Sequence, residues 1–276
     1  MNSIAIVADE RRSRPRIALR LRPQAWRGFG GLLVLVAICE AVPRSGLVNP
    51  TFLPPFSEII ASLVRQAGTA VFWEAVGSTL RGWAIGLAIA MVAGTLLGIV
   101  VGSSRFLRNA TASTIEFLRP IPSVALIPLA VLLFGTSMQA TLLIVVYASF
   151  WQVLIQVLYG VQDVDPIARE TARSYRFRTL TQIRMVVWPT ALPYVVTGFR
   201  LAATVALVLE MTGELVMATP GLGQQITQAQ SSGNIPAMYA LVIVAGLFGV
   251  LVNVAARAGQ ARVLRWHPSI RKDLPR

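Results

Sequence analysis

Six apolar runs alternate with short polar segments along this chain of 276 residues. A helix needs about 20 predominantly apolar residues to cross a bilayer, and most of these runs approach or exceed that length. The pattern therefore predicts an all-α membrane protein with six transmembrane helices. The predicted spans are residues 29–42, 77–101, 111–134, 140–159, 194–216 and 237–256.

The first run is the shortest and follows a basic stretch, so a cleaved signal peptide is the alternative to a membrane helix. No A-x-A cleavage pattern follows this run. We therefore expect an uncleaved first helix.

The second run carries a small residue at every fourth position. Such stripes let two helices approach closely in lipid. We expect the stripe to pack against another helix of the same subunit, and the alternative is a mobile contact between subunits. The stripe consists of Gly82, Gly86, Ala90, Gly94, Gly98 and Gly102.

Prolines mark two other places. Pro120, Pro122 and Pro128 fall within the third run, where they predict a kinked span with Glu116 and Arg119 at its cytoplasmic end. Between the first two spans, a proline-rich stretch precedes a short amphipathic helix, for which Ser57 is the expected N-cap.

A polar segment, residues 163–193, separates the fourth and fifth spans. It contains five arginines. Asp165-Pro166 is a typical helix start, and the segment predicts two short helices, 167–175 and 181–188, the second ended by Pro189. Two helices of this kind would form a compact projection from the membrane.

Composition and charge agree with a membrane protein and give its orientation. Hydrophobic residues make up 55% of the chain and charged residues 13%, against about 25% charged in a typical soluble domain. The net charge of +13 raises nucleic-acid binding as a possibility. However, twenty Lys and Arg residues fall on one side of the predicted topology and two in the opposite loops. Because basic loops stay in the cytoplasm, both termini and the polar segment are expected there.

The expected organisation is a basic cytoplasmic tail (1–27), a transmembrane domain (28–256) with a cytoplasmic loop at 160–193, and a second basic tail (257–276).

Three scarce residues exclude much chemistry. Cys39, His267 and Lys272 are the single cysteine, histidine and lysine. One cysteine and one histidine provide no metal cluster or catalytic triad. The phosphate-binding loop of an ATPase requires a lysine after a glycine-rich turn, and Lys272 has no such context. We expect no catalytic or metal site and no ATP-driven activity in this chain alone.

Two acids in the fifth span are candidates for a transport path or gate. Glu210 and Glu214 are four residues apart and share a helical face, and intramembrane charges usually face a cavity or a partner. The alternative is an ion pair, with Arg81 as the obvious partner. Two acids lining a cavity would argue against an unshielded anionic substrate.

The PGLG sequence that follows, with Gly221 and Gly223, completes the candidate gate. It precedes a predicted helix start, where free N–H groups can hold an anion. A plain turn is the expected interpretation.

The polar segment resembles the cytoplasmic loop of bacterial ABC importer permeases, the inner-membrane component of binding-protein-dependent transport systems. Glu170-Thr171-Ala172 matches the opening of the family signature, and Val186-x-Trp188-Pro189 matches its close at the same separation. FLPPFSEII, the glycine-rich second span, LRPIPSVALIPLAVLLFG, ALPYVVTGFRLA and PGLG extend the resemblance over nearly the whole chain. It is strongest to the nitrate, sulfonate and taurine branch.

The resemblance implies a type I permease fold and a function. The chain would form the solute pathway for a small solute in the bacterial inner membrane. Its partners would be two ABC ATPase subunits that bind ATP and Mg, a second permease copy (identical or paralogous), and an extracytoplasmic binding protein. The residues implied in ATPase coupling are Glu170, Thr171, Ala172, Arg173, Arg176, Val186 and Pro189. The remaining alternatives are an ATPase-independent channel or secondary transporter, and a solvated loop that holds topology or binds anionic lipid.

Two residues depart from the family signature. Thr171 replaces an alanine, and Arg176 stands where the family has glycine, at the turn between the two short helices. Glycine adopts backbone angles that other residues resist. Arg176 therefore predicts either a differently shaped turn or an altered contact surface.

Overall fold

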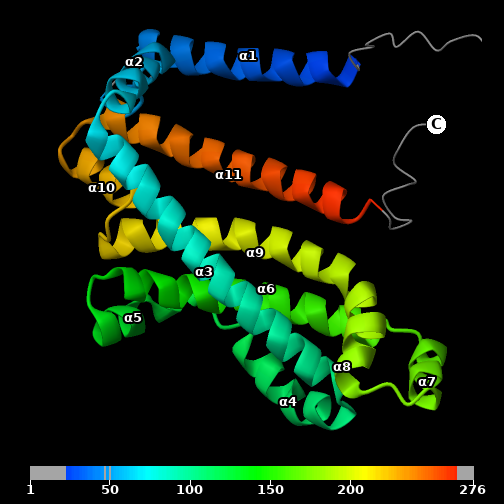
Figure 1. The fold of residues 1–276 in the computed structure, drawn as a ribbon. Coiled ribbons are helices and arrows are strands. Elements are labelled where there is room, and N and C mark those ends of the chain that lie inside the picture. The colour runs from blue at the N-terminus through cyan, green and yellow to red at the C-terminus, as the bar shows by residue number, and fades with distance from the viewer. Residues whose placement is uncertain (1–22, 47, 50, 266–276) are drawn as a thin grey trace, which may run out of the picture.

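The computed structural model describes residues 23–46, 48–49 and 51–265, and every regular element in these ranges is helical (Figure 1). The predicted tails lie largely outside these ranges, although α1 begins at Pro23 and α11 continues to Val263. The helices are α1 (Pro23–Arg44), α2 (Phe56–Ala67), α3 (Ala70–Ser103), α4 (Arg105–Leu118), η1 (Ser123–Leu126), α5 (Ile127–Phe134), α6 (Met138–Gln162), α7 (Pro166–Ser174), α8 (Thr179–Gln182), η2 (Ile183–Val187), α9 (Trp188–Met217), α10 (Leu222–Ser231) and α11 (Ile235–Val263).

Four helical stretches in the described part of the chain are long and apolar enough to cross a membrane: α3, α6, residues 179–217, and α11. A fifth candidate is the bent pair formed by α4 and residues 123–134. The predicted first span falls in α1, which is not among these candidates. Six spans and two cytoplasmic termini therefore stay predictions.

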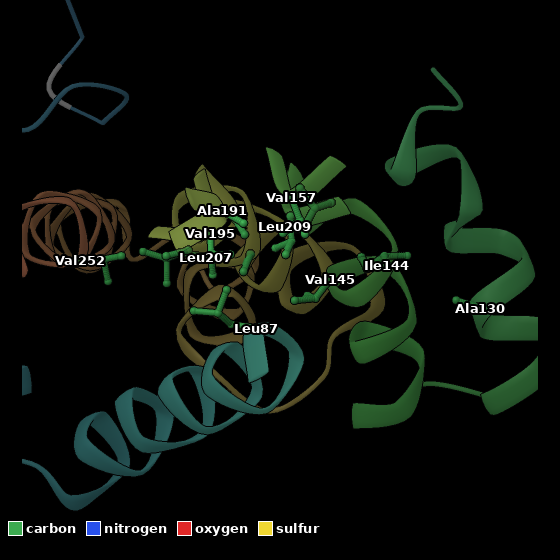
Figure 2. Close-up of a cluster of buried hydrophobic side chains, with 14 of the residues drawn as sticks. Leu87, Ala130, Ile144, Val145, Val157, Ala191, Val195, Leu207, Leu209 and Val252 are labelled. Carbon is green, nitrogen blue, oxygen red and sulfur yellow. The ribbon is translucent and has the colours of Figure 1, made fainter. Parts of the chain in front are cut away.

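Helix α6 lies at the centre of the fold, packed along α9 on one side and α3 on the other (Figures 1 and 2). The small residues of α3 face a row of valines on α6. A Cβ atom added to Gly94, Gly98 or Gly102 would lie 2.7–2.9 Å from the Cβ of Val153, Val157 or Val161, respectively. The two backbones approach closely because one helix lacks side chains where the other has branched ones. The stripe is an intramolecular packing surface, as expected.

The predicted third span is not one continuous helix. Helix α4 ends at Leu118, and the next helical segment begins at Ser123, bent by 82°. Pro120 and Pro122 fall within the break; proline has no N–H to donate, and it disfavours helical angles in the residue before it. The hydroxyl of Tyr147 on α6 donates to the Leu118 carbonyl at 2.6 Å, which satisfies one acceptor at the broken end.

Two charged residues lie beside the break: Glu116 is in the last turn of α4, and Arg119 directly follows that helix. Helix α4 starts earlier than predicted, at Arg105. The expected position of Glu116 and Arg119 at the cytoplasmic end of the third span stays a prediction.

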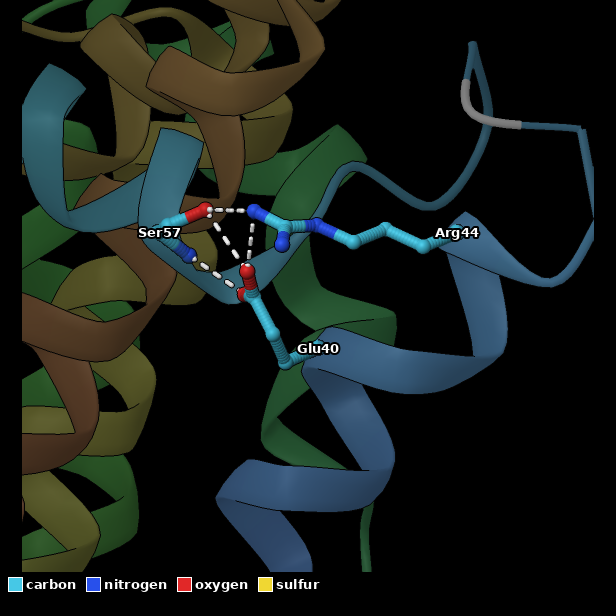
Figure 3. Close-up of polar contacts among 3 residues, drawn as sticks. All are labelled: Glu40, Arg44 and Ser57. Atoms are coloured by element: carbon cyan, nitrogen blue, oxygen red, sulfur yellow. Dashed lines mark hydrogen bonds and ion pairs between the residues drawn. The ribbon is translucent and has the colours of Figure 1, made fainter.

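A polar contact joins α1 to the start of α2 (Figure 3). The Glu40 carboxylate accepts hydrogen bonds from the backbone N–H and the hydroxyl of Ser57, both at 2.9 Å, and forms an ion pair with Arg44. The prediction of Ser57 as N-cap was wrong: α2 begins at Phe56, and Glu40 satisfies a first-turn N–H from outside the helix. Apart from this corner, most of residues 30–44 of α1 are exposed.

Candidate functional site

Helix α7 is attached to the ends of the two central helices. Asp165 caps it, accepting a hydrogen bond from the Ile167 N–H at 2.8 Å. Arg169 donates to the Val161 carbonyl in the last turn of α6 at 2.7 Å, and Tyr194 of α9 donates to Asp163 at 3.0 Å. These contacts hold the loop against both α6 and α9.

The guanidinium of Arg169 is partly withdrawn from water. Burial, together with the positive charges of Arg108 and Arg173, lowers its pKa. Its hydrogen bond lies at a helix C-terminus, where the macrodipole favours a positive charge. Arg169 therefore contributes to the attachment of α7 and is not available as a free surface charge.

The outward face of α7 is a mixture of charged and apolar groups. Ala172 is buried, whereas Glu170, Thr171 and Arg173 are exposed. Their role in ATPase coupling stays a prediction. The exposed apolar side chains Ile167 and Tyr175, 72% and 74% exposed, were not predicted. The sequence prediction for this segment rested on its arginines. The apolar residues between the charged ones in α7 were the signal for the exposed apolar side chains.

The turn after α7 keeps a left-handed backbone despite its arginine. Arg176 has φ +55°. Its N–H donates to the Arg173 carbonyl at 2.8 Å, and the Phe177 N–H donates to the Ala172 carbonyl at 3.0 Å. This pair of bonds is the Schellman pattern, in which glycine is usual at the left-handed position. The turn has the shape that glycine favours, so Arg176 alters the exposed surface of the loop and not the path of its backbone.

The second short helix does not end at Pro189. Helix α8 passes through a π-helical turn, η2, directly into α9. The Trp188 N–H donates to the Ile183 carbonyl, five residues earlier. The wider turn lies just before Pro189, which has no N–H, so the chain continues as helix through the proline. Val186 is half-buried, and Pro189 is exposed.

A cavity of about 330 Å³ separates α7 from this continuous helix. Its lining includes Arg173 on one side, and Thr179, Gln182 and Val186 on the other. The coupling residues predicted from the sequence thus lie on the outer face of α7, in the turn that follows it, on the wall of this cavity, or at the base of α9.

A second, larger cavity of about 630 Å³ lies beside the broken span. Arg108, Glu116 and Arg119 line it together with residues from the last two turns of α6. Non-helical backbone at membrane depth is tolerated where it is buried in protein or borders a water-filled cavity. The broken backbone and three charged side chains therefore lie at the same cavity.

At the opposite end of the molecule from α7, the two predicted acids are buried. The residue surfaces of Glu210 and Glu214 are 4% and 0% exposed. Glu210 faces Gly82 of α3, and Glu214 faces both Gly221 and Gly223, where an added Cβ would collide with its side chain. All four predicted path or gate residues are thus in one place: Gly221 leaves room for the Glu214 carboxyl, and Gly223 leaves room for Glu214 Cβ and the backbone of α9.

Backbone N–H groups at the start of α10 close this cluster. The Gly223 N–H donates to Glu214 Oε2 at 2.8 Å, and the Leu222 N–H donates to the Thr79 hydroxyl at 2.9 Å. Thr219 and Thr141 share a hydrogen bond of 3.1 Å. The PGLG sequence is therefore more than a plain turn: its helix N-terminus is occupied by a carboxyl of the same chain.

The alternative of an ion pair with Arg81 was wrong. Arg81 is exposed, and neither Glu210 nor Glu214 has a cationic partner within 4.0 Å among the described residues. Glu210 Oε2 and Glu214 Oε1 are buried without a hydrogen-bond partner there.

No sequence pattern indicated that Thr79 and Thr141 belong to this cluster, or that Gly82 faces a carboxyl group. Gly82 was grouped with the other small residues of α3 because it shares their four-residue spacing. It differs in facing a carboxyl of α9, where the other glycines of the stripe face aliphatic side chains of α6. No periodicity distinguishes the two situations.

In the described part of the chain, no three His, Cys, Asp or Glu side chains are placed to bind a metal ion together.

Three features are those of a transport permease: the helical fold, the loop at residues 163–193 that is held against α6, and the broken span formed by α4 and residues 123–134. A family model described as "Binding-protein-dependent transport system inner membrane component" matches residues 90–266, and the chain belongs to this family. It is a multi-pass bacterial inner-membrane protein and an ABC importer permease of the nitrate, sulfonate and taurine branch.

Two relatives illustrate the branch. The chain is 28% identical to the taurine transport system permease protein TauC of Escherichia coli (strain K12) over 274 residues, which cover 97% of this chain and 100% of that protein. It is 27% identical to the nitrate import permease protein NrtB of Leptolyngbya laminosa over 208 residues, 75% of this chain and 74% of that protein.

Solved structures agree on the fold. A chain of the MetNI methionine ABC transporter, in an inward-facing conformation, superposes with a TM-score of 0.61 at 18% identity. The match covers 70% of this chain and 96% of that chain.

Proposed function

We propose that this chain forms the solute pathway of an ABC importer and couples ATP hydrolysis by separate ATPase subunits to uptake of a small solute. Two ATPase subunits hold ATP and Mg. A second permease copy, identical or paralogous, completes the pathway, and an extracytoplasmic binding protein delivers the solute. Six spans with both termini in the cytoplasm complete this arrangement.

The observation that carries the coupling proposal is the mounting of α7. Arg169 ties α7 to the last turn of α6, and the Asp163–Tyr194 contact ties the end of α6 to α9, while Glu170 and Thr171 of α7 are exposed. A partner that pushes on this surface displaces the ends of two central helices. A loop whose only role was to fix topology would need no such attachment.

The relatives support a small solute of the taurine, sulfonate or nitrate type. Taurine carries a sulfonate, and nitrate is an anion. The sequence argument against an anion depended on Glu210 and Glu214 facing a cavity, but both are enclosed by protein. Arg108 and Arg119 outnumber Glu116 among the charged side chains lining the cavity beside the break, which favours an anionic solute.

The test is purification of the tagged chain from membranes of its source bacterium, followed by assay of bound ATPase. We expect an ATPase to co-purify, and Glu170→Ala to reduce the ATP hydrolysis of the preparation about tenfold. Glu58→Ala, at an exposed glutamate of α2, is the matched control and should leave hydrolysis unchanged.

An ATPase-independent channel or secondary transporter gives a different result. Solute would then move through proteoliposomes that contain this chain alone, and no ATPase would accompany it. That outcome would overturn the proposed function.

A further inference from the structure

The loop at residues 218–223 connects α9 to α10 at the end of the fold opposite α7 (Figure 1). One side chain from each of three helices forms a hydrogen bond with this loop. Glu214 comes from α9, Thr79 from α3 and Thr141 from α6, and all three are buried. Their partners are Gly223, Leu222 and Thr219, which are half of the loop residues.

The contact with Glu214 is built by steric exclusion as well as by hydrogen bonding. A Cβ atom at Gly223 would lie 2.6 Å from Glu214 Cβ and 2.7 Å from the Met211 carbonyl oxygen. A Cβ at Gly221 would collide with the carboxyl itself. Two glycines on either side of Leu222 therefore let the loop backbone close around a single side chain.

The contact between Glu214 and the Gly223 N–H needs a hydrogen-bond acceptor and does not need a negative charge. Glu214 is 0% exposed, and a buried negative charge without a cation is strongly unfavourable. The Gly223 N–H requires only an oxygen atom in the right place. A group that attracted or repelled a passing solute by charge would have to face the solute, and Glu214 does not.

The enclosed arrangement is also incompletely satisfied. Glu214 Oε1 and Glu210 Oε2 are buried without partners in the described part of the chain. A buried acceptor without a partner raises the free energy of the state that contains it.

We propose that Glu214 is a positioning residue that holds the 218–223 loop closed, and that this loop, bound also by Thr79 and Thr141, fixes the ends of α3, α6 and α9 relative to one another. The loop opens when these helix ends separate during transport. This second statement rests on the proposed function, whereas the first concerns the chain alone.

The primary experiment is hydrogen–deuterium exchange of the peptide covering residues 218–226, measured on the full chain in lipid nanodiscs. We expect Glu214→Ala to accelerate exchange in this peptide about tenfold or more, because the Gly223 and Leu222 amides lose their protection. Glu214→Gln retains an acceptor oxygen and should stay close to the wild-type rate. Glu74→Ala, at an exposed glutamate of α3, is the control for loss of an acid.

The second readout is ATP hydrolysis by the complex purified with its ATPase. We expect Glu214→Gln to retain at least half of the wild-type rate and Glu214→Ala to lose most of it. Unchanged exchange in Glu214→Ala would overturn the positioning role, whatever the hydrolysis rate. A protected loop in Glu214→Gln with hydrolysis as low as in Glu214→Ala would also overturn it, because the charge would then be essential.

The two readouts separate this proposal from the proposed function. Exchange rates that follow the prediction in a preparation with no associated ATPase would support the loop contact while contradicting the importer. Altered exchange across all peptides of Glu214→Ala would indicate general unfolding, and the behaviour of Glu214→Gln then decides the case.

Discussion

The carboxyl group of Glu210 occupies the space that a side chain at residue 82 would need. A Cβ atom on Gly82 would lie 2.6 Å from Glu210 Cδ and 2.9 Å from Oε2. The glycine of α3 is therefore required by one side chain of α9. Replacement of Gly82, and not of Glu210, tests this relationship directly.

We expect Gly82→Ala to destabilise the protein by about 1–3 kcal/mol, because the added methyl group overpacks a buried contact. Gly77→Ala is the matched control in the same helix, since nothing lies within 4 Å of a Cβ there. That change should be neutral or slightly stabilising, because alanine favours helix over glycine. Thermal unfolding in detergent, followed by size-exclusion chromatography, measures both. Equal midpoints for the two variants would show that Gly82 is not constrained by Glu210.

We expect Arg176→Gly to stabilise the turn after α7 by about 0.5–1 kcal/mol, because glycine adopts a positive φ without the steric cost that arginine meets. Arg176→Ala retains that cost and removes the same charge. Thermal stability should therefore rise only in the glycine variant.

The same pair separates the backbone effect from partner contact. If the Arg176 side chain contacts the ATPase, both variants will reduce co-purification of the ATPase to a similar extent. Reduced co-purification in the glycine variant alone would show that the shape of the turn matters and the side chain does not.

We expect Arg169→Gln to loosen α7, because it removes a charge-assisted hydrogen bond to the end of α6. Such bonds contribute about 1.5–3 kcal/mol when well buried, and the partial exposure of Arg169 reduces this to about 1 kcal/mol. Exchange in residues 163–178 should accelerate about fivefold. Arg178→Gln removes an exposed arginine of the same loop and should have no such effect; equal acceleration in both variants would contradict the role given to Arg169.

We expect Tyr147→Phe to destabilise the break in the third span by about 0.5–1.5 kcal/mol, because the Leu118 carbonyl loses its donor. Tyr159→Phe is the control: it lies on the same helix and is 55% exposed. Proteolysis at residues 118–122 should become faster in the first variant only. Resistance in both would show that the prolines alone determine the break.

The sequence was sufficient for the features that depend on local pattern. Apolar length predicted α3, α6, α9 and α11, and the spacing from Glu170 to Pro189 predicted the loop and its family. The four-residue stripe predicted close packing of α3 within one subunit. In each case the physical cause lies within one helix or one loop, so it is visible along the chain.

The failures depend on contacts between distant segments. Pro189 was expected to end a helix, but a π-helical turn accommodates it. Ser57 was expected to cap α2, but Glu40 from another helix reaches its N–H. An ion pair with Arg81 was the alternative for Glu210 and Glu214, whereas the partner that the folded chain supplies to Glu214 is the backbone N–H of Gly223. Sequence patterns report preferences of residues and contain no information about which distant groups meet.

The continuity of α8, η2 and α9 has a mechanical consequence. Helix α9 contains 30 residues, which corresponds to a length of about 45 Å. One end lies at the cavity beneath α7 and the other holds Glu214, with no flexible connection in between. A tilt of about 5° at the first end would displace the second by about 4 Å over this length. One continuous helix therefore links the loop that we propose as the ATPase contact to the 218–223 loop at the opposite end of the fold.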